Sequence, residues 1–117
     1  MRKSPLKKRS KNKISVLKRK ADESVGSYVK SLSDKCYTCG AEVEGSNKHC
    51  GHFISRTHSA TRYHLDNLRI QCFRCNVWLR GNMHEFAARL LAELGQARFN
   101  LLIAEGRKIV QLTRKDY

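Results

Sequence analysis

Two cysteine pairs, Cys36-Tyr-Thr-Cys39 and Cys72-Phe-Arg-Cys75, constrain this chain more than any other feature. Two intervening residues let both sulfurs of a pair reach one metal ion, and two such pairs supply the four thiolates of a closed, tetrahedral zinc site. The alternatives are two unrelated pairs or a redox-active pair. We predict a shared structural Zn²⁺, because the core from Cys36 to Gly81 is too short to be held by apolar burial alone.

Positive charge is concentrated at the start of the chain. The 117 residues carry a net charge of +14, and residues 1–20 hold ten lysines and arginines and no acid. A segment this basic does not collapse on itself, so we expect residues 1–13 to be a disordered arm that binds an anion, with nucleic acid favoured over a plain solubility tail. The DNA-binding residues predicted in this arm are Arg2, Lys3, Lys7, Lys8, Arg9, Lys11 and Lys13.

The sequence contains no apolar run long enough to cross a membrane. Met1-Arg2-Lys3 is followed by more charge instead of the apolar stretch of a secretory signal. We therefore expect a cytoplasmic protein with no membrane partner. In that reducing compartment, five cysteines indicate a metal site and one spare thiol, Cys50, more readily than disulfides.

Apolar periodicity divides the remaining chain into three parts. Residues 14–34 are expected to form an amphipathic helix with a basic outer face. Residues 35–81 are predicted to form the zinc-bound core. It contains a strand over 48–57, which pairs either with 61–65 or with the stretch before its turn, and a short helix that ends at Gly81.

The third part, residues 82–113, is predicted to be a pair of helices separated at Gly95. Asn82 and Glu85 are expected to cap the first of them. The apolar stripes of both helices exceed what a small zinc core would cover. We therefore predict a homodimer through residues 83–110, with intramolecular packing of these helices as the alternative.

The segment between the cysteine pairs carries candidates for phosphodiester hydrolysis, which needs a base, a cation and donors to the phosphate. His52 is the candidate base, and Asn67 would accept its other N–H and fix the tautomer. Asn76 offers an oxygen to a hard cation. The predicted phosphate clamps are Arg56, Arg62 and Arg69. The plainer alternatives are that the histidine is a surface or hydrogen-bonded core residue, that Asn67 shapes a turn, and that Arg56 and Arg62 are solvated.

The order of these residues resembles the HNH endonucleases, especially the zinc-knuckle type related to recombination endonuclease VII. It is closer still to the phage NinG family, the lambda Rap recombination nucleases. The resemblance spans about residues 20–105 and is carried by Cys36-Tyr-Thr-Cys39-Gly40, Gly51-His52-Phe53, Arg62-Tyr63-His64-Leu65-Asp66-Asn67, Gln71-Cys72-Phe-Arg-Cys75-Asn76 and Leu79-Arg-Gly81-Asn82.

This resemblance implies a small α+β fold, in which a zinc-stabilised HNH core (ββα-metal, treble-clef-like) is flanked by helices. It implies a metal-dependent, structure-specific DNA endonuclease that cuts branched recombination intermediates, such as Holliday junctions and D-loops, in the cytoplasm of a phage's bacterial host. Zn²⁺ would be structural, and Mg²⁺ or Mn²⁺ would serve catalysis.

One position departs from the general HNH pattern. The residue before the base histidine is usually an aspartate that binds the metal, and here it is Gly51. His49 shares a strand face with residue 51 and is one substitute ligand beside Asn76; His64 and Asp66 are others. A site with histidine would admit Mn²⁺, Ni²⁺ or Zn²⁺ more readily than a site built of oxygens alone.

The roles of the two histidines also stay open, since His52 would bind the metal if His64 were the base. Two other functions compete with the endonuclease. One is a noncatalytic zinc-finger protein that binds DNA or RNA, which Gly51 favours. The other is a small basic interaction protein.

Overall fold

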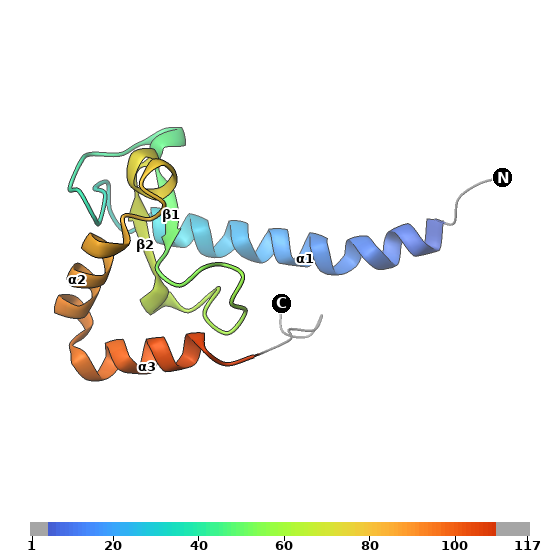
Figure 1. Ribbon diagram of the computed structural model, residues 1–117. Helices are drawn as coiled ribbons and strands as arrows, with labels where there is room; N and C mark the ends of the chain where they lie inside the picture. Colours follow the sequence, from blue (N-terminus) through green and yellow to red (C-terminus); the bar gives the residue numbers. More distant parts are fainter. Residues whose placement is uncertain (1–4, 110–117) are drawn as a thin grey trace.

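The structure, a computed structural model, describes the backbone of residues 5–109 and the side chains of residues 14–109. It is a small α+β fold (Figure 1). The helices and strands follow in the order α1 (Pro5–Lys30), β1 (His49–His52), β2 (Leu68–Gln71), a π-helical turn (Arg74–Trp78), α2 (Met83–Leu94) and α3 (Gln96–Gly106), and single 3₁₀ turns precede each strand.

β1 and β2 form an antiparallel two-stranded sheet, in which Cys50 lies opposite Ile70 and His52 lies opposite Leu68. Both predicted pairings of the first strand are therefore wrong, because its partner lies beyond residue 65. The alternation of apolar and polar residues in Leu68–Gln71 is the strand signal that the prediction overlooked.

One face of this sheet is covered by α1. Val25 and Val29 of α1 pack there with Leu68 and Ile70 in a cluster that includes three of the four paired cysteines. Gly26 is buried there, and a Cβ on it would lie 3.9 Å from that of Cys50, so the glycine lets α1 pack closely on β1. A second cluster lies on the C-terminal side and consists of Phe86, Leu90, Leu94 and Leu102, with Tyr37, Phe53, Ile54 and Phe99 packed against it.

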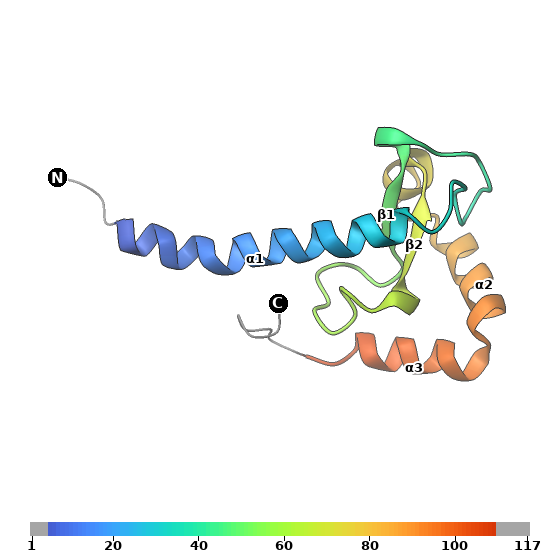
Figure 2. The same ribbon diagram turned by 180° about the vertical axis from the view of Figure 1, so that it is seen from behind.

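The start of α1 differs from the prediction. The helix begins at Pro5, whereas the sequence analysis assigned residues 1–13 to a disordered arm and began the helix at Ile14. Proline is favoured at the first position of a helix, and lysine and arginine are good helix formers, so the basic run continues the helix. Its first half projects away from the other elements (Figures 1 and 2). The predicted arm residues Arg2 and Lys3 lie outside the described residues.

The predicted C-terminal helix pair is present, and it turns at Gly95, which has a φ of +83°. The predicted cap is not formed. The backbone of Asn82 is left-handed, with φ of 48°, and its side-chain Nδ2 donates to Cys75 Sγ at 3.6 Å instead of its side chain capping the helix. Residues 110–113 of the predicted pair lie outside the described part. Among residues 5–109, no helix combines the length and apolarity needed to span a membrane.

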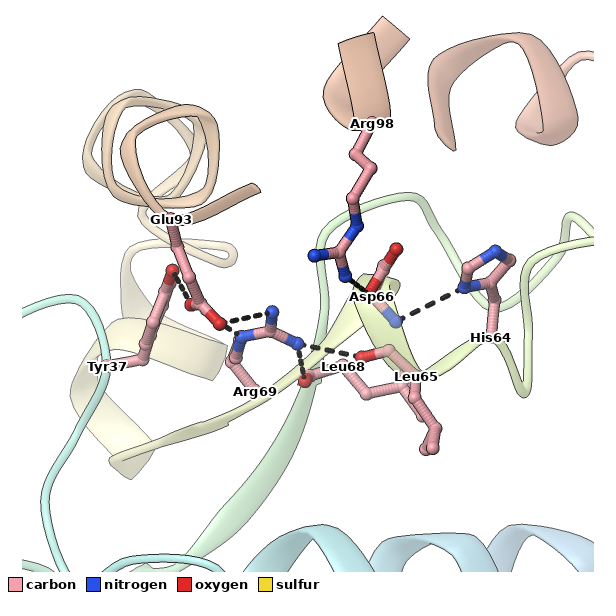
Figure 3. A network of polar contacts seen from close by, with 8 residues as sticks. All are labelled: Tyr37, His64, Leu65, Asp66, Leu68, Arg69, Glu93 and Arg98. Atoms are coloured by element: carbon pink, nitrogen blue, oxygen red, sulfur yellow. Dashed lines mark hydrogen bonds and ion pairs between the residues drawn. The ribbon is translucent and has the colours of Figure 1, made fainter. Parts of the chain in front are cut away.

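A polar network joins α2 and α3 to the sheet (Figure 3). Glu93 of α2 accepts hydrogen bonds from the Tyr37 hydroxyl at 2.6 Å and from the Arg69 guanidinium at 3.1 and 3.2 Å. Arg98 of α3 pairs with Asp66 at 2.6 Å. These contacts fix the C-terminal helices against the first cysteine pair and β2.

An ion pair joins α1 to the loop between the strands. Arg62, only 7% exposed, donates from Nε and Nη2 to the two carboxylate oxygens of Asp22 at 2.9 and 2.7 Å. Its Nη1 donates to the Arg56 carbonyl oxygen at 2.9 Å. The hydrogen bond from Arg62 lowers the pKa of Asp22 although burial opposes it, so Asp22 is ionised at neutral pH.

Asp22→Asn should lower the free energy of unfolding by about 2 kcal/mol at pH 7, because it leaves the buried Arg62 charge without its counter-ion. Urea denaturation measures the loss. The neighbouring Glu23, which is exposed, supplies the control Glu23→Gln with little change expected. Since the pKa of Asp22 is lowered from 3.8, the contribution is complete above that pH and disappears as pH falls through the lowered value. Equal losses in both variants at pH 7 would contradict this role of the pair.

Candidate metal centre and adjoining cavity

The four cysteines of the two pairs come together. Their Sγ atoms all lie within 4.8 Å of one another, and Cys39 Sγ lies 3.8 Å from Cys72 Sγ. Zinc–sulfur bonds of about 2.3 Å place the sulfurs of a tetrahedron about 3.8 Å apart, so the group fits one Zn²⁺. The predicted set of four possible zinc ligands is therefore confirmed, and it joins the segment before β1 to the segment after β2.

Hydrogen bonds reach several of these sulfurs, and at Cys36 they favour the thiolate. The Thr38 hydroxyl lies 3.4 Å from Cys36 Sγ, and the Cys75 amide donates to Cys72 Sγ at 3.4 Å. Burial raises the pKa of Cys36, but hydrogen bonds from Thr38 and from backbone amides outweigh it and bring the pKa to about 6. A thiolate is the form that binds Zn²⁺.

A cavity of about 490 Å³ lies beside this centre, between α1 and β1. His49, Cys50 and His52 of β1 border it together with Asn76 of the π-helical turn and Asp22 of α1. Burial raises the pKa of Cys50 to about 11, so this thiol is neutral and packs against α1. The cavity brings together residues that are distant in sequence, and its remaining polar lining includes Glu23, Lys30, Lys48, Arg56 and Arg62.

His52 is held by one backbone contact. Its Nε2 lies 3.0 Å from the Arg62 carbonyl oxygen, and because a carbonyl only accepts, Nε2 carries the proton and Nδ1 of the neutral ring has a free lone pair. Burial lowers the pKa of His52 from 6.5, and the hydrogen bond to Arg62 offsets this only in part. The imidazole is therefore neutral at pH 7 and able to accept a proton.

Asn67 does not have the predicted role of fixing the His52 tautomer. It is fully buried, its Oδ1 accepts from the Ile54 amide at 2.7 Å, and its Nδ2 donates to the Ile54 and Thr61 carbonyls at 3.0 and 3.1 Å. All three of these hydrogen bonds go to the backbone of the loop between the strands. Asn67 thus shapes the loop whose Arg62 carbonyl orients His52.

The structure explains why position 51 is a glycine. A Cβ on Gly51 would lie 2.1 Å from Oε1 of Gln71, whose side chain crosses that position. Gln71 is fully buried, and its Nε2 donates to the Thr38 hydroxyl at 3.1 Å and to the Gly81 carbonyl at 2.8 Å. Within the described residues its Oε1 has no hydrogen-bond partner. An aspartate at position 51 would displace this glutamine.

His49 and Asn76, the tentative ligands of a catalytic metal, contact each other. Asn76 Nδ2 lies 3.0 Å from His49 Nδ1, and His49 Nε2 lies 3.1 Å from the Ser46 carbonyl oxygen. The Ser46 carbonyl requires the proton on Nε2, so Nδ1 accepts from Asn76. In the described part of the chain, the four cysteines are the one group of at least three His, Cys, Asp or Glu side chains placed to hold an ion.

The other substitute residues lie elsewhere. His64 is exposed, and its Nδ1 accepts from the Asp66 amide at 3.2 Å, which caps the 3₁₀ turn before β2 (Figure 3). Asp66 is paired with Arg98. Neither residue borders the cavity, so the geometry favours His52 over His64 as the base.

The three predicted phosphate clamps differ in what they contact. Arg62 forms an ion pair with Asp22. Arg69 forms an ion pair with Glu93 and donates hydrogen bonds to the Leu65 and Leu68 carbonyls. Arg56 is exposed and borders the cavity. Arg56 is therefore the one of the three whose placement suits contact with a phosphate.

Sequence reasoning missed Asp22, Gln71 and the close approach at Gly26. The buried glycine within an apolar helical stripe was the available signal for the approach of α1 to β1. Arg62, the partner of Asp22, lies 40 residues away, and Thr38 and Gly81, the partners of Gln71, lie 33 and 10 residues away, so no local pattern indicates these contacts.

A family model described as Bacteriophage Lambda NinG protein matches residues 1–117. No curated protein and no solved structure gives a significant match.

Purified protein should contain about one tightly held zinc ion per chain, and Cys75→Ser should unfold the core. Structural Zn²⁺ contributes about 10–16 kcal/mol in zinc-finger peptides, as much as the whole stability of a small domain. Metal analysis and circular dichroism measure the two effects. Cys50→Ser, which alters the cysteine outside the four-sulfur group, is the control and should keep both the zinc and the fold. A folded Cys75→Ser protein without zinc would refute the prediction.

Proposed function

The chain belongs to the NinG family, and from this membership and the cavity beside His52 we propose that it is a metal-dependent, structure-specific DNA endonuclease. Its substrates would be branched recombination intermediates, such as Holliday junctions and D-loops. The observation that carries the proposal is a half-buried, neutral histidine whose Nε2 is fixed by a carbonyl and whose Nδ1 is free, in a cavity whose lining includes Lys30, Lys48 and Arg56. The layout of a cysteine pair, two strands and a second pair opening a helical turn is compatible with the HNH core that the sequence suggested.

In this proposal, His52 takes a proton from the attacking water as the phosphodiester bond is broken. Nδ1 is the accepting atom, and the Arg62 carbonyl stabilises the imidazolium that forms, because it already accepts the other N–H. Arg56 contacts a phosphate oxygen beside it. The ion pair between Asp22 and Arg62 and the buried Asn67 act through the loop and are positioning residues.

A divalent cation, Mg²⁺ or Mn²⁺, would neutralise charge that develops on the phosphate. Asn76 and His49 are the residues of this chain proposed to contribute to its binding, with DNA oxygens supplying the rest, since such ions commonly keep few protein ligands. The exchange of the His49–Asn76 hydrogen bond for an ion would require the two side chains to separate.

A noncatalytic zinc-binding nucleic-acid protein is the second candidate. It is favoured by the lack, within the described residues, of a second cluster of His, Cys, Asp or Glu side chains, and by the glutamine that fills the place of an aspartate at position 51. Nicking of branched DNA by pure protein separates the two functions.

We also propose, as a separate matter, that two copies act together on a four-way junction, since its resolution needs two nicks. The chain already buries Phe86, Leu90, Leu94 and Leu102 internally, so these residues are not available to a partner. A dimer through residues 83–110 would have to form through the apolar side chains of this segment that remain exposed, such as Leu101, which is 68% exposed.

His52→Ala should slow single-turnover cleavage of a four-way junction by about 100-fold or more, with DNA affinity nearly unchanged, because a general base acts only in the transition state. His64→Ala is the matched control, an exposed histidine outside the cavity, and should cut at nearly the wild-type rate. Thermal melting of both variants checks that the fold is intact. A large loss with His64→Ala and a small one with His52→Ala would reverse the assignment of the base.

The same assay has a pH dependence of defined sign. His52 works as a base only when neutral, and its pKa is lowered from 6.5, so kcat/KM should rise with pH and level off below the pH at which an ordinary histidine would deprotonate. A rate that rises only above this pH would contradict His52 as the base.

Deleting residues 1–13 should flatten the slope of log K against log salt by several units, since each lost phosphate contact on duplex DNA removes about 0.9. The cut position should stay the same, because phosphate contacts carry no sequence information. Deletion of residues 110–117, which removes two basic residues and one acid, is the control. An unchanged slope after the N-terminal deletion would show that this segment does not touch DNA.

A further inference from the structure

The second cysteine pair is followed by an unusually exposed apolar surface, which we call the Trp78 surface. Trp78, the single tryptophan of the chain, is 76% exposed. Large apolar side chains of this size are normally well buried, and an exposed cluster of them marks a contact site. The members of the Trp78 surface are Phe73, Val77, Trp78, Leu79 and Met83, each at least 39% exposed.

The zinc centre determines which side of this segment faces outward. Cys75 is fully buried among the four sulfurs, so residues on the opposite side of the turn must point away from the core. The turn is π-helical, with the Leu79 amide donating to the Arg74 carbonyl five residues back at 2.8 Å. In such a turn, residues four and five apart lie on the same side, which groups Phe73 with Val77 and Trp78.

The backbone of this surface is held at both ends. The Phe73 amide donates to Asn47 Oδ1 at 2.8 Å, and the Gly81 amide donates to the Cys75 carbonyl at 2.8 Å. The Phe73 ring also meets His49 edge-on, with centroids 5.7 Å apart. The aromatic side chains are thus presented on a rigid support, which lowers the entropy lost when a partner binds.

The charge around the Trp78 surface has one sign. Arg74 and Arg80 are exposed within it, neither has an ion-pair partner among the described residues, and residues 73–84 contain no acid. Exposed aromatic rings with flanking free arginines suit a ligand that has both flat rings and negative charge. An unpaired nucleotide meets this description better than an apolar protein surface.

The Trp78 surface also lies close to the cavity. Asn76 lies in the same π-helical turn and borders the cavity, and Phe73 touches His49, which borders it too. We propose that Trp78 stacks on an unpaired base at a branch point of DNA while Arg74 and Arg80 contact the adjacent phosphates. The inference rests on the proposed function and adds to it the feature by which branched DNA would be told from duplex.

The single tryptophan makes a direct test possible. Its fluorescence is followed without divalent cation, so that no cleavage occurs. Wild-type protein is titrated with a four-way junction that has unpaired bases at its centre, or with a matched, fully paired duplex. The junction should quench the emission and the duplex should not. Trp78→Ala should weaken junction binding by about tenfold or more with little effect on duplex, and Trp78→Phe should retain most of the affinity. Leu32→Ala, at an apolar residue that follows α1 and is 62% exposed, should change neither.

The outcomes separate this inference from the proposed function. Quenching by the junction without any later cleavage in Mg²⁺ or Mn²⁺ would support the stacking and overturn the nuclease. Cleavage without quenching, or equal losses of junction and duplex affinity in Trp78→Ala, would overturn the stacking and leave the nuclease standing. Emission that shifts to the blue as the free protein is concentrated would overturn it in favour of an interface between copies of the chain.

Discussion

Four cysteine sulfurs within 4.8 Å of one another are the constraint on which the rest of this structure depends. One pair precedes β1 and the other follows β2, so a Zn²⁺ bound by them would close the ends of a sheet with only two strands of four residues each. A sheet this small is marginal by itself. The thiolate site therefore determines the hairpin, and the hairpin in turn determines where His52 and the Trp78 surface lie.

The cavity beside His52 depends on how the side chain of Gln71 is packed. Gln71 crosses the place where a side chain at position 51 would stand, and it links Thr38 beside the zinc cysteines to Gly81 at the end of the π-helical turn. The metal centre, the strand that carries His52 and the turn that carries Asn76 are thus packed as one unit. The absence of an acid at position 51 follows from this packing, so any divalent ion must be bound in another way.

Local patterns predicted the parts of the fold that local chemistry decides. The spacing of the cysteines predicted that the four sulfurs meet at one site, and the apolar stripe around Leu90 predicted the helix α2. The pairing of β1 with β2 was missed because the alternation in Leu68–Gln71 is only four residues long and was overlooked as a strand. The roles of Asn67 and Arg62 were mistaken because their hydrogen bonds go to a loop and to α1, and neither contact follows from sequence spacing.

The most direct test of the account withdraws zinc and follows the fold and cleavage in one sample. Zinc is removed with a thiol-reactive mercurial and a chelator, excess reductant is added, and Mg²⁺ or Mn²⁺ is then restored. The circular dichroism signal of the folded protein and its nicking of a four-way junction should disappear together. Both should return at about one zinc equivalent per chain. A protein that stays folded and cuts the junction without zinc would contradict the account.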